Sequence, residues 1–265
     1  MKGYVTTSMG QVHYRTEGKC GEYLVLLHEY PLSSRMFEKA ILLLGKYFRV
    51  FALDIPGYGE SDPPDGSIGI PDYAHWLLEA LDTLGVQRFA LAGVHTGAAI
   101  ALELALEAGD NRLTHLILSG IPLLSPEQQK KFLSALEEPD VRADGIHLIK
   151  VWQSRLKNYG EDAALDLLQM GAVDILKIYE RYHWAYLSVF QYDPGPRLSQ
   201  VSCPILFLNG EHDRLAACDA EAVKLVKGGT LKIIPGAKGQ LPWREPEIYA
   251  KEVSAFIIGS GNSES

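Results

Sequence analysis

A histidine between two glycines is the residue of this chain whose position most clearly suggests chemistry. In the segment LAGVHTGAAIALELA, residues 91–105, a β-rich run leads through Gly93, His95 and Gly97 directly into a helical pattern. A strand-to-helix turn this tight brings two backbones together and leaves no room for a Cβ atom at the flanking positions, which explains the glycines. The central side chain therefore projects from a strand end, where an imidazole can transfer a proton.

Four other segments place polar residues after predicted strands: HEYP at 28–31, DIPGYGES at 54–61, GEHD at 210–213 and IPGAKGQLPW at 234–243. Together with the histidine segment they resemble the motifs of the α/β-hydrolase family. The first is similar to the family's oxyanion loop, and the second to its Asp-x-Pro-Gly-x-Gly-x-Ser turn. The third is similar to the segment that delivers the catalytic acid, and the fourth to the loop that delivers the catalytic histidine. The resemblance covers nearly the whole chain, in the family's order.

The resemblance implies roles for several residues, and it also shows where this chain departs from the family. Backbone N–H groups of Tyr30 and Thr96 are expected to form the oxyanion hole, and the acid position holds Asp213. The nucleophile position, usually serine, aspartate or cysteine, holds His95. The position expected for the catalytic histidine, the residue before Gln240, holds Gly239. Without a hydroxyl and its base, a serine-type relay is not available.

These departures suggest a histidine-aspartate dyad. We expect His95 to project into the space opened by Gly239 and to hydrogen-bond Asp213. The positive end of the following helix favours a neutral ring, whereas Asp213 raises its pKa, so the pair is expected to supply a general base near neutral pH. Glu29 replaces the glycine that follows His28 in the family; it could pair with His95, but we expect it to point to solvent.

A metal site made by His28, His95 and Asp213 is the less favoured interpretation, and we expect neither metal nor cofactor. His28 is expected to orient its loop through hydrogen bonds, and His212 to lie at the surface.

An insertion without strand patterns runs from Ser125 to Tyr192, and its aromatic residues would suit the roof of an apolar cavity. We expect the pocket to include Trp152 and Trp184 from this insertion and His28, Glu29, Gly239 and Gln240 from the loops. The alternative is that the aromatic residues pack the insertion's own core.

Alternating short apolar runs and helical patterns predict an α/β fold, a mostly parallel eight-stranded sheet with helices on both faces and a helical cap insertion. Residues 1–124 and 193–265 would form the core of a single domain, and residues 125–192 the insertion. Strands are expected at 4–7, 12–15, 23–27, 49–53, 88–92, 116–119, 205–208 and 231–234, and helices at 72–84, 96–108 and 246–256.

The composition of the chain disfavours some classes of binding partner. A formal net charge of -8 without a basic cluster disfavours nucleic acid and anionic membranes. Three cysteines without metal-ligand spacing, no signal peptide and no apolar run of membrane-spanning length favour a reducing cytoplasm. A small molecule is the expected partner, and the tendency of such folds to dimerise leaves a homodimer open.

Two functions fit the sequence. The first is a hydrolase-like enzyme that acts on a small, partly apolar molecule through the His95/Asp213 dyad. The second is a catalytically silent hydrolase homologue that keeps the pocket and binds a small-molecule ligand.

Overall fold

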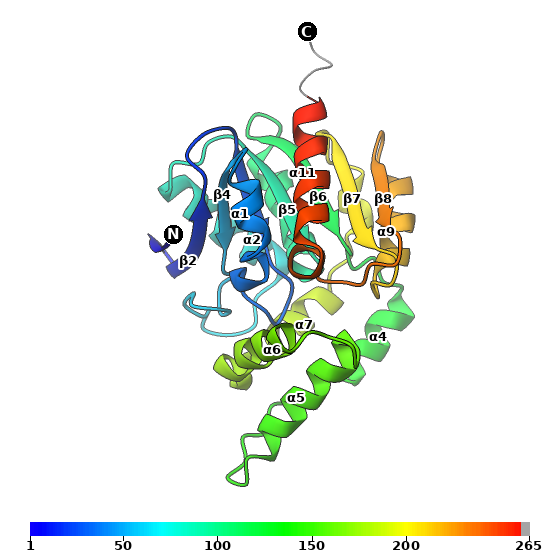
Figure 1. Ribbon diagram of the computed structural model, residues 1–265. Coiled ribbons are helices and arrows are strands. Elements are labelled where there is room, and N and C mark those ends of the chain that lie inside the picture. Colours follow the sequence, from blue (N-terminus) through cyan, green and yellow to red (C-terminus); the bar gives the residue numbers. More distant parts are fainter. Residues whose placement is uncertain (261–265) are drawn as a thin grey trace.

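Eight strands lie side by side in the order β1-β2-β4-β3-β5-β6-β7-β8 in the computed structural model, which describes residues 1–260 (Figure 1). The pairs β1–β2 and β2–β4 are antiparallel and the other neighbours are parallel. The predicted mostly parallel eight-stranded sheet is therefore confirmed. The strands are β1 (Lys2–Thr7), β2 (Gly10–Glu17), β3 (Tyr23–Leu27), β4 (Arg49–Leu53), β5 (Phe89–Val94), β6 (Leu113–Ser119), β7 (Ile205–Gly210) and β8 (Thr230–Ile234).

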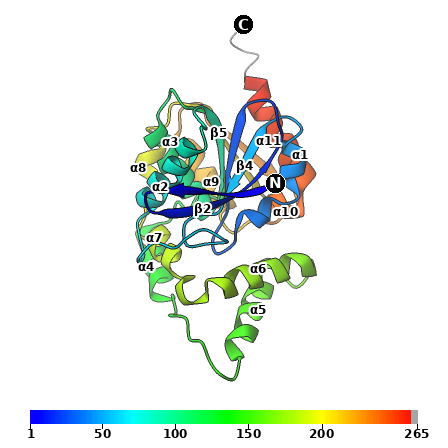
Figure 2. The ribbon, with the colours of Figure 1, turned by 90° about the vertical axis from the view of Figure 1, so that its left-hand side faces the viewer.

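Helices cover both faces of this sheet, as predicted (Figure 2). One face carries α1 (Ala40–Leu44), α10 (Leu241–Arg244) and α11 (Pro246–Ser260). The opposite face carries α2 (Ile70–Thr83), α3 (Thr96–Ala108), α8 (Gly195–Leu198) and α9 (Ala216–Ala222). Short 3-10 turns occur at Ser34–Phe37, Tyr179–Arg181 and Val223–Leu225.

The central strands are apolar throughout because both of their faces are buried. In β3, Leu24 and Leu26 pack into the core beneath α1 and α11, whereas Val25 and Leu27 pack into the core beneath α2 and α3. Successive side chains of a strand point to opposite faces, so a strand between two helical layers must be apolar at every position.

Between β6 and β7 the chain forms helices and, within residues 125–192, no strand: α4 (Pro126–Ser134), α5 (Ile146–Tyr159), α6 (Leu165–Lys177) and α7 (Trp184–Phe190). These helices lie together beyond one end of the sheet (Figure 1). That is the end where the parallel strands finish, because residues that follow β3 and β5 line a cavity with residues of this insertion. The exact core and insertion boundaries stay a prediction, and residues 261–265 of the predicted core lie outside the described part.

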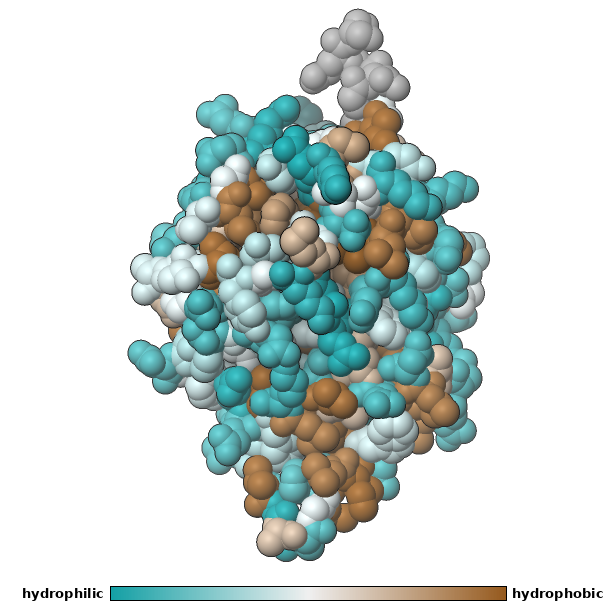
Figure 3. Space-filling model, turned by 60° about the vertical axis from the view of Figure 1, so that its left-hand side comes forward, coloured by the Kyte–Doolittle hydropathy of each residue, from teal (hydrophilic) through white to brown (hydrophobic). Residues whose placement is uncertain are grey.

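Apolar side chains gather on the outer surface of the insertion, at the lower end of the molecule in Figure 3. The exposed ones include Val141, Leu148, Ile149, Trp152 and Leu165. In the part of the chain that the structure describes, no helix has both the length and the apolar character that a bilayer crossing requires.

Candidate functional site

His95 lies at the sharp corner between β5 and α3. Its φ of 49° is positive, a backbone conformation in which histidine is tolerated better than bulkier residues. A Cβ at Gly93 would lie 2.3 Å from the carbonyl oxygen of Gly97, and one at Gly97 would lie 2.4 Å from the carbonyl oxygen of His28. Both flanking glycines are therefore required by the close approach of strand, helix and neighbouring loop.

Both nitrogens of the His95 ring contact carboxylates. Nε2 lies 2.9 Å from Asp213 Oδ2, and Nδ1 lies 2.8 Å from Glu29 Oε2. The three side chains, which we call the His95 cluster, are all more than 90% buried. The expectation that Glu29 points to solvent is wrong: the buried loop after β3 turns its carboxylate toward the imidazole, which offers it a charged partner.

The space at Gly239 is filled differently from what the sequence suggested. A Cβ at Gly239 would lie 2.3 Å from Asp213 Oδ2, so the carboxylate and not the imidazole ring occupies this position. The side chain that this loop delivers to the site is that of Gln240, which has a φ of 58° and donates from Nε2 to Glu29 Oε1 over 3.0 Å. The loop therefore contributes a neutral amide that holds Glu29.

Room for the ring comes from Gly120, the residue after β6. A Cβ there would lie 2.4 Å from His95 Cδ2. The Gly120 N–H donates to Asp219 Oδ2 over 2.8 Å, and Asn209 Nδ2 donates to the same oxygen over 2.9 Å. Burial raises the pKa of Asp219 to about 6, although these donors oppose the rise. Sequence reasoning missed this carboxylate, since it lies in a helix with no motif around it.

Charge decides the protonation state of the His95 cluster. Burial alone would lower the pKa of His95, but the charges of Asp213 and Glu29 and their hydrogen bonds outweigh burial and raise it to about 10. Burial raises the pKa of Asp213, yet the imidazolium reverses this and brings it to about 2. The pKa of Glu29 is lowered in the same way.

At neutral pH the cluster is thus an imidazolium between two carboxylates: its Nε2–H donates to Asp213, and its Nδ1 forms an ion pair with Glu29. The expected general base near neutral pH is not what this environment produces, because a second carboxylate adds to the first and together they outweigh the effect of burial on the His95 pKa.

The remaining predicted loop residues surround this cluster. His28 is fully buried; its Nδ1 donates to the Glu29 carbonyl oxygen over 2.9 Å and its Nε2 accepts from Ile55 N–H over 2.9 Å. Both nitrogens are engaged, so His28 orients its loop and has none free for a metal. Within residues 1–260 no group of three or more histidine, cysteine, aspartate or glutamate side chains is arranged so that it could hold a metal ion. Tyr30 and Thr96 line the cavity beside His95.

The cavity above His95 has a volume of about 590 Å³ and lies between the sheet end and the insertion. Among its lining residues are Tyr179, Tyr182, Tyr186 and Phe190. Trp152 and Trp184 are not among them: Trp152 is 38% exposed on α5, and Trp184, the first residue of α7, lies two positions from Tyr182 and from Tyr186, which do line the cavity. Helix rotation, which a list of aromatic residues does not reveal, decides which rings face inward.

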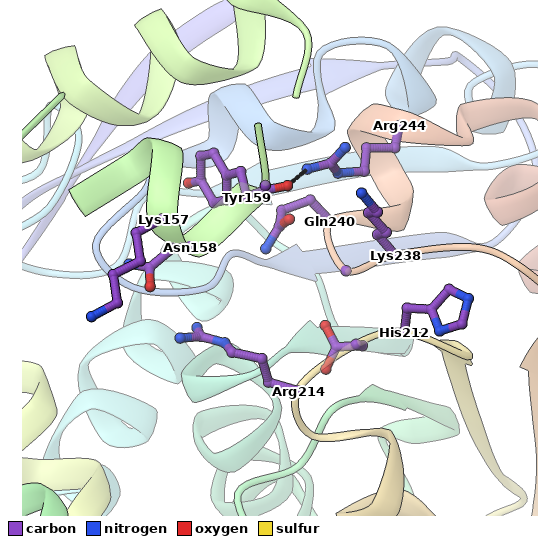
Figure 4. Close-up of a pocket in the computed structure, with 11 residues that line it drawn as sticks. Lys157, Asn158, Tyr159, His212, Arg214, Lys238, Gln240 and Arg244 are labelled. Carbon is purple, nitrogen blue, oxygen red and sulfur yellow. Dashed lines mark hydrogen bonds between the residues drawn. The ribbon is translucent and has the colours of Figure 1, made fainter. Parts of the chain in front are cut away.

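A smaller pocket of about 230 Å³ adjoins this cavity and reaches Asp213, Gly239 and Gln240 from outside. Figure 4 shows the Arg214 side chain extending toward Asn158, while the His212 ring lies on the far side and points away. Arg214 and Asn158 line both spaces. His28 and Glu29 line neither, because they form the buried layer beneath the ring.

Sequence reasoning also missed Arg155, which is 7% exposed and lines the main cavity. The signal lay in the stripe Lys150, Val151, Ser154, Arg155 and Asn158, whose spacing places all five on one helical face.

Comparison with known proteins gives the context of this arrangement. The family model described as "alpha/beta hydrolase fold" matches residues 22–146. The chain is 24% identical over 262 residues to (E)-2-((N-methylformamido)methylene)succinate hydrolase of Acinetobacter baylyi, covering 92% of this chain and 93% of that protein. It is 25% identical over 268 residues to carboxylesterase YbfK of Bacillus subtilis, covering 97% of this chain and 87% of the esterase.

Among solved structures, the enol-lactonase from Burkholderia xenovorans LB400 superposes with a TM-score of 0.82 at 20% identity, covering 97% of this chain and all of that one. This likeness concerns the fold.

Proposed function

We propose, from the premise that the chain has the α/β-hydrolase fold and hydrolases among its relatives, that it binds a small, partly apolar molecule beneath the insertion without forming an acyl-enzyme. The observation that carries this proposal is the engagement of both His95 nitrogens, at 2.8 Å and 2.9 Å, by buried carboxylates. A ring in this state has no lone pair to accept a proton.

The size and lining of the cavity support the binding of a small molecule. Its volume of about 590 Å³ lies within the range of small-molecule sites, and aromatic side chains line it on the insertion side. In this proposal the His95 cluster is a fixed, charged floor that orients the ligand. It performs no proton transfer at neutral pH.

A second candidate is the acid-base enzyme with the His95/Asp213 dyad. It is favoured by the placement of Tyr30 and Thr96, whose backbone N–H groups are the expected oxyanion donors, on the wall that His95 also lines. For His95 to act as a base, its ring must first release a proton, for example at Nδ1, which would break the contact with Glu29. Its activity would therefore rise as pH increases toward the His95 pKa of about 10.

Turnover measurements separate the two candidates. Purified protein is incubated with p-nitrophenyl acetate, p-nitrophenyl butyrate and small lactones from pH 6 to pH 10, with binding of the same compounds followed by thermal shift. We expect binding without turnover at pH 7, and no added acyl mass on the intact protein.

The test variant is His95→Asn, at a buried histidine. Its matched control is His212→Asn, the same change at an exposed histidine near the site. Turnover at pH 7 that is lost in His95→Asn and kept in His212→Asn would refute silent binding and establish the enzyme. An Ala135→Trp change at the exposed cavity rim should weaken binding of every compound, because the indole fills the entrance.

A further inference from the structure

Arg155 is a buried cation whose charge no protein carboxylate neutralises at close range. The residue is 7% exposed, and within residues 1–260 no carboxylate oxygen lies within 4.0 Å of its guanidinium nitrogens. In the described part of the chain its Nε has no hydrogen-bond partner, and its Nη2 donates to Ser154 Oγ over 3.2 Å. Another neighbour is the Tyr159 ring, whose centroid is 5.4 Å from the guanidinium carbon.

A buried guanidinium without a nearby anion destabilises the fold unless another group pairs with its charge. An arginine is charged at every physiological pH, and burying its charge without an anion carries a large desolvation penalty. The missing partner must reach the guanidinium from the cavity, since Arg155 is one of the residues that line it. A planar guanidinium with an unused Nε edge suits a carboxylate, which accepts two parallel N–H groups.

The rest of the cavity wall has the same sign of charge. Lys150 and Arg214 also line it, and in the described part of the chain neither has a carboxylate within 4.0 Å. Against these cations the wall carries one carboxylate, that of the exposed Glu137. At the floor, the His95 imidazolium is offset by the carboxylates of Glu29 and Asp213, so the cationic groups that face the ligand are those of the wall.

Apolar and aromatic side chains line the same cavity as these cations. Phe132 and Phe190 stack with ring centroids 5.1 Å apart, and Tyr186 stacks on Phe190 at 5.7 Å. All three line the cavity, together with Val151 and Val189. A ligand that fills this space must therefore combine an anionic end with an apolar body.

We propose that the cavity binds a small carboxylate-bearing molecule, with its carboxylate paired to Arg155 and its apolar body against the rings of Phe132, Tyr186 and Phe190. This inference rests on the proposed function and adds the chemical class of its ligand. A single anionic group is favoured over a dianion, because the charge of Glu29 already acts on Arg155 and Arg214 and would repel a second negative charge.

The test compares two probes of equal shape, 3-phenylpropionate and 3-phenylpropionamide, by isothermal titration calorimetry at pH 7. The wild-type chain should bind the carboxylate at least tenfold more tightly than the amide. Arg155→Gln should reduce that ratio to about one by weakening carboxylate binding, with amide affinity changed less than twofold.

Arg142→Gln is the matched control, since Arg142 lies on the same insertion, is 53% exposed and does not line the cavity. It should keep the wild-type ratio. Arg155→Lys retains the charge but not the planar edge, and it should give a ratio between those of wild type and Arg155→Gln. It also tests the proposal should Arg155→Gln fail to fold.

The outcomes are distinct from those that test the proposed function. Equal affinity for the two probes in the wild-type chain would overturn the carboxylate inference while leaving small-molecule binding intact. A carboxylate preference that persists in Arg155→Gln would overturn the role of Arg155. Failure of both probes to bind would overturn the inference, and the proposed function would then be judged by its own compound panel.

Discussion

Replacing His95 by asparagine should change how the protein's stability depends on pH. Asparagine tolerates the positive φ of this corner but cannot carry charge, so Glu29 and Asp213 would remain buried without a cation between them. Removing one partner of a buried ion pair costs about 3–5 kcal/mol. We expect the variant to lose free energy of unfolding in this range at pH 6.

The wild-type pH dependence follows from the pKa values. A rise of the His95 pKa from 6.5 to about 10 corresponds to roughly 5 kcal/mol at about 1.36 kcal/mol per pH unit. Because the folded pKa is above the unfolded one, this stabilisation is complete below pH 6.5 and is lost as pH rises from 6.5 through 10. Asp213, lowered from 3.8 to about 2, stabilises above pH 3.8 and loses its contribution as pH falls toward 2.

Urea unfolding followed by tryptophan fluorescence at each pH from 5 to 10 measures the effect. The difference between wild type and His95→Asn should be largest near pH 6 and should shrink by several kcal/mol toward pH 10. His212→Asn, at an exposed position, should follow wild type within about 0.5 kcal/mol throughout. A difference between wild type and His95→Asn that is constant from pH 6.5 to 10 would refute the charged ring.

Three further changes probe the same cluster. Glu29→Gln removes one of the two carboxylates, so the His95 pKa should fall below its wild-type value yet stay above 6.5 because Asp213 remains. An NMR titration of the His95 ring measures this pKa. An unchanged pKa would contradict the pairing of His95 with Glu29. Gly120→Ala places a Cβ 2.4 Å from the ring at a φ of 68°, so the free energy of unfolding should fall by about 2 kcal/mol, as measured by urea unfolding. Gly239→Ala places a Cβ 2.3 Å from Asp213 Oδ2, which should push the carboxylate from the ring and lower the His95 pKa in the same titration.

Gly66→Ala is the matched control for both glycine changes. A Cβ at Gly66 meets nothing within 4 Å, and its φ is not in the left-handed region. It should alter neither stability nor the His95 titration. If Gly120→Ala and Gly239→Ala were as mild as this control, the tight fit around the ring and its acid would be wrong.

The central strands of the sheet could be predicted closely because they are buried on both faces. The runs at 23–27 and 49–53 agree with the structure at every residue, since an unbroken apolar strand between charged or glycine-containing turns has clear limits. The helix at 96–108 was equally clear, because it starts at the glycine-flanked corner and ends before Gly109. The helix predicted at 72–84 begins earlier, at Ile70, because Asp72 accepts from Gly69 N–H and caps the first turn.

The site was predicted only in part, for a physical reason. Chain order shows that His95, Asp213 and the 234–243 loop meet at the strand ends, but not which way a side chain turns in a loop. The Glu29 carboxylate points inward to His95. The 234–243 loop contributes the side chain of Gln240 to the site, and not one at position 239. The protonation state then followed from a second carboxylate that a linear motif could not place.

The place of Arg155 in the cavity was missed for a different reason, although the residue spacing of α5 puts it on one helical face with other cavity residues. Whether an arginine on an amphipathic helix faces solvent or a cavity depends on how the whole helix is rotated against its neighbours. Only packing of α5 against α6 decides it, and Gly171 on α6 makes room: a Cβ there would lie 3.1 Å from Arg155 Cδ.

The protonation state of His95 at neutral pH tests the central claim most directly. In protein with 15N-labelled histidine, the His95 signals, identified by their absence from His95→Asn, report protonation of each ring nitrogen. Both nitrogens should be protonated from pH 6 to about pH 9, with deprotonation near pH 10. A neutral ring at pH 7, with one unprotonated nitrogen, would contradict the imidazolium held between Glu29 and Asp213.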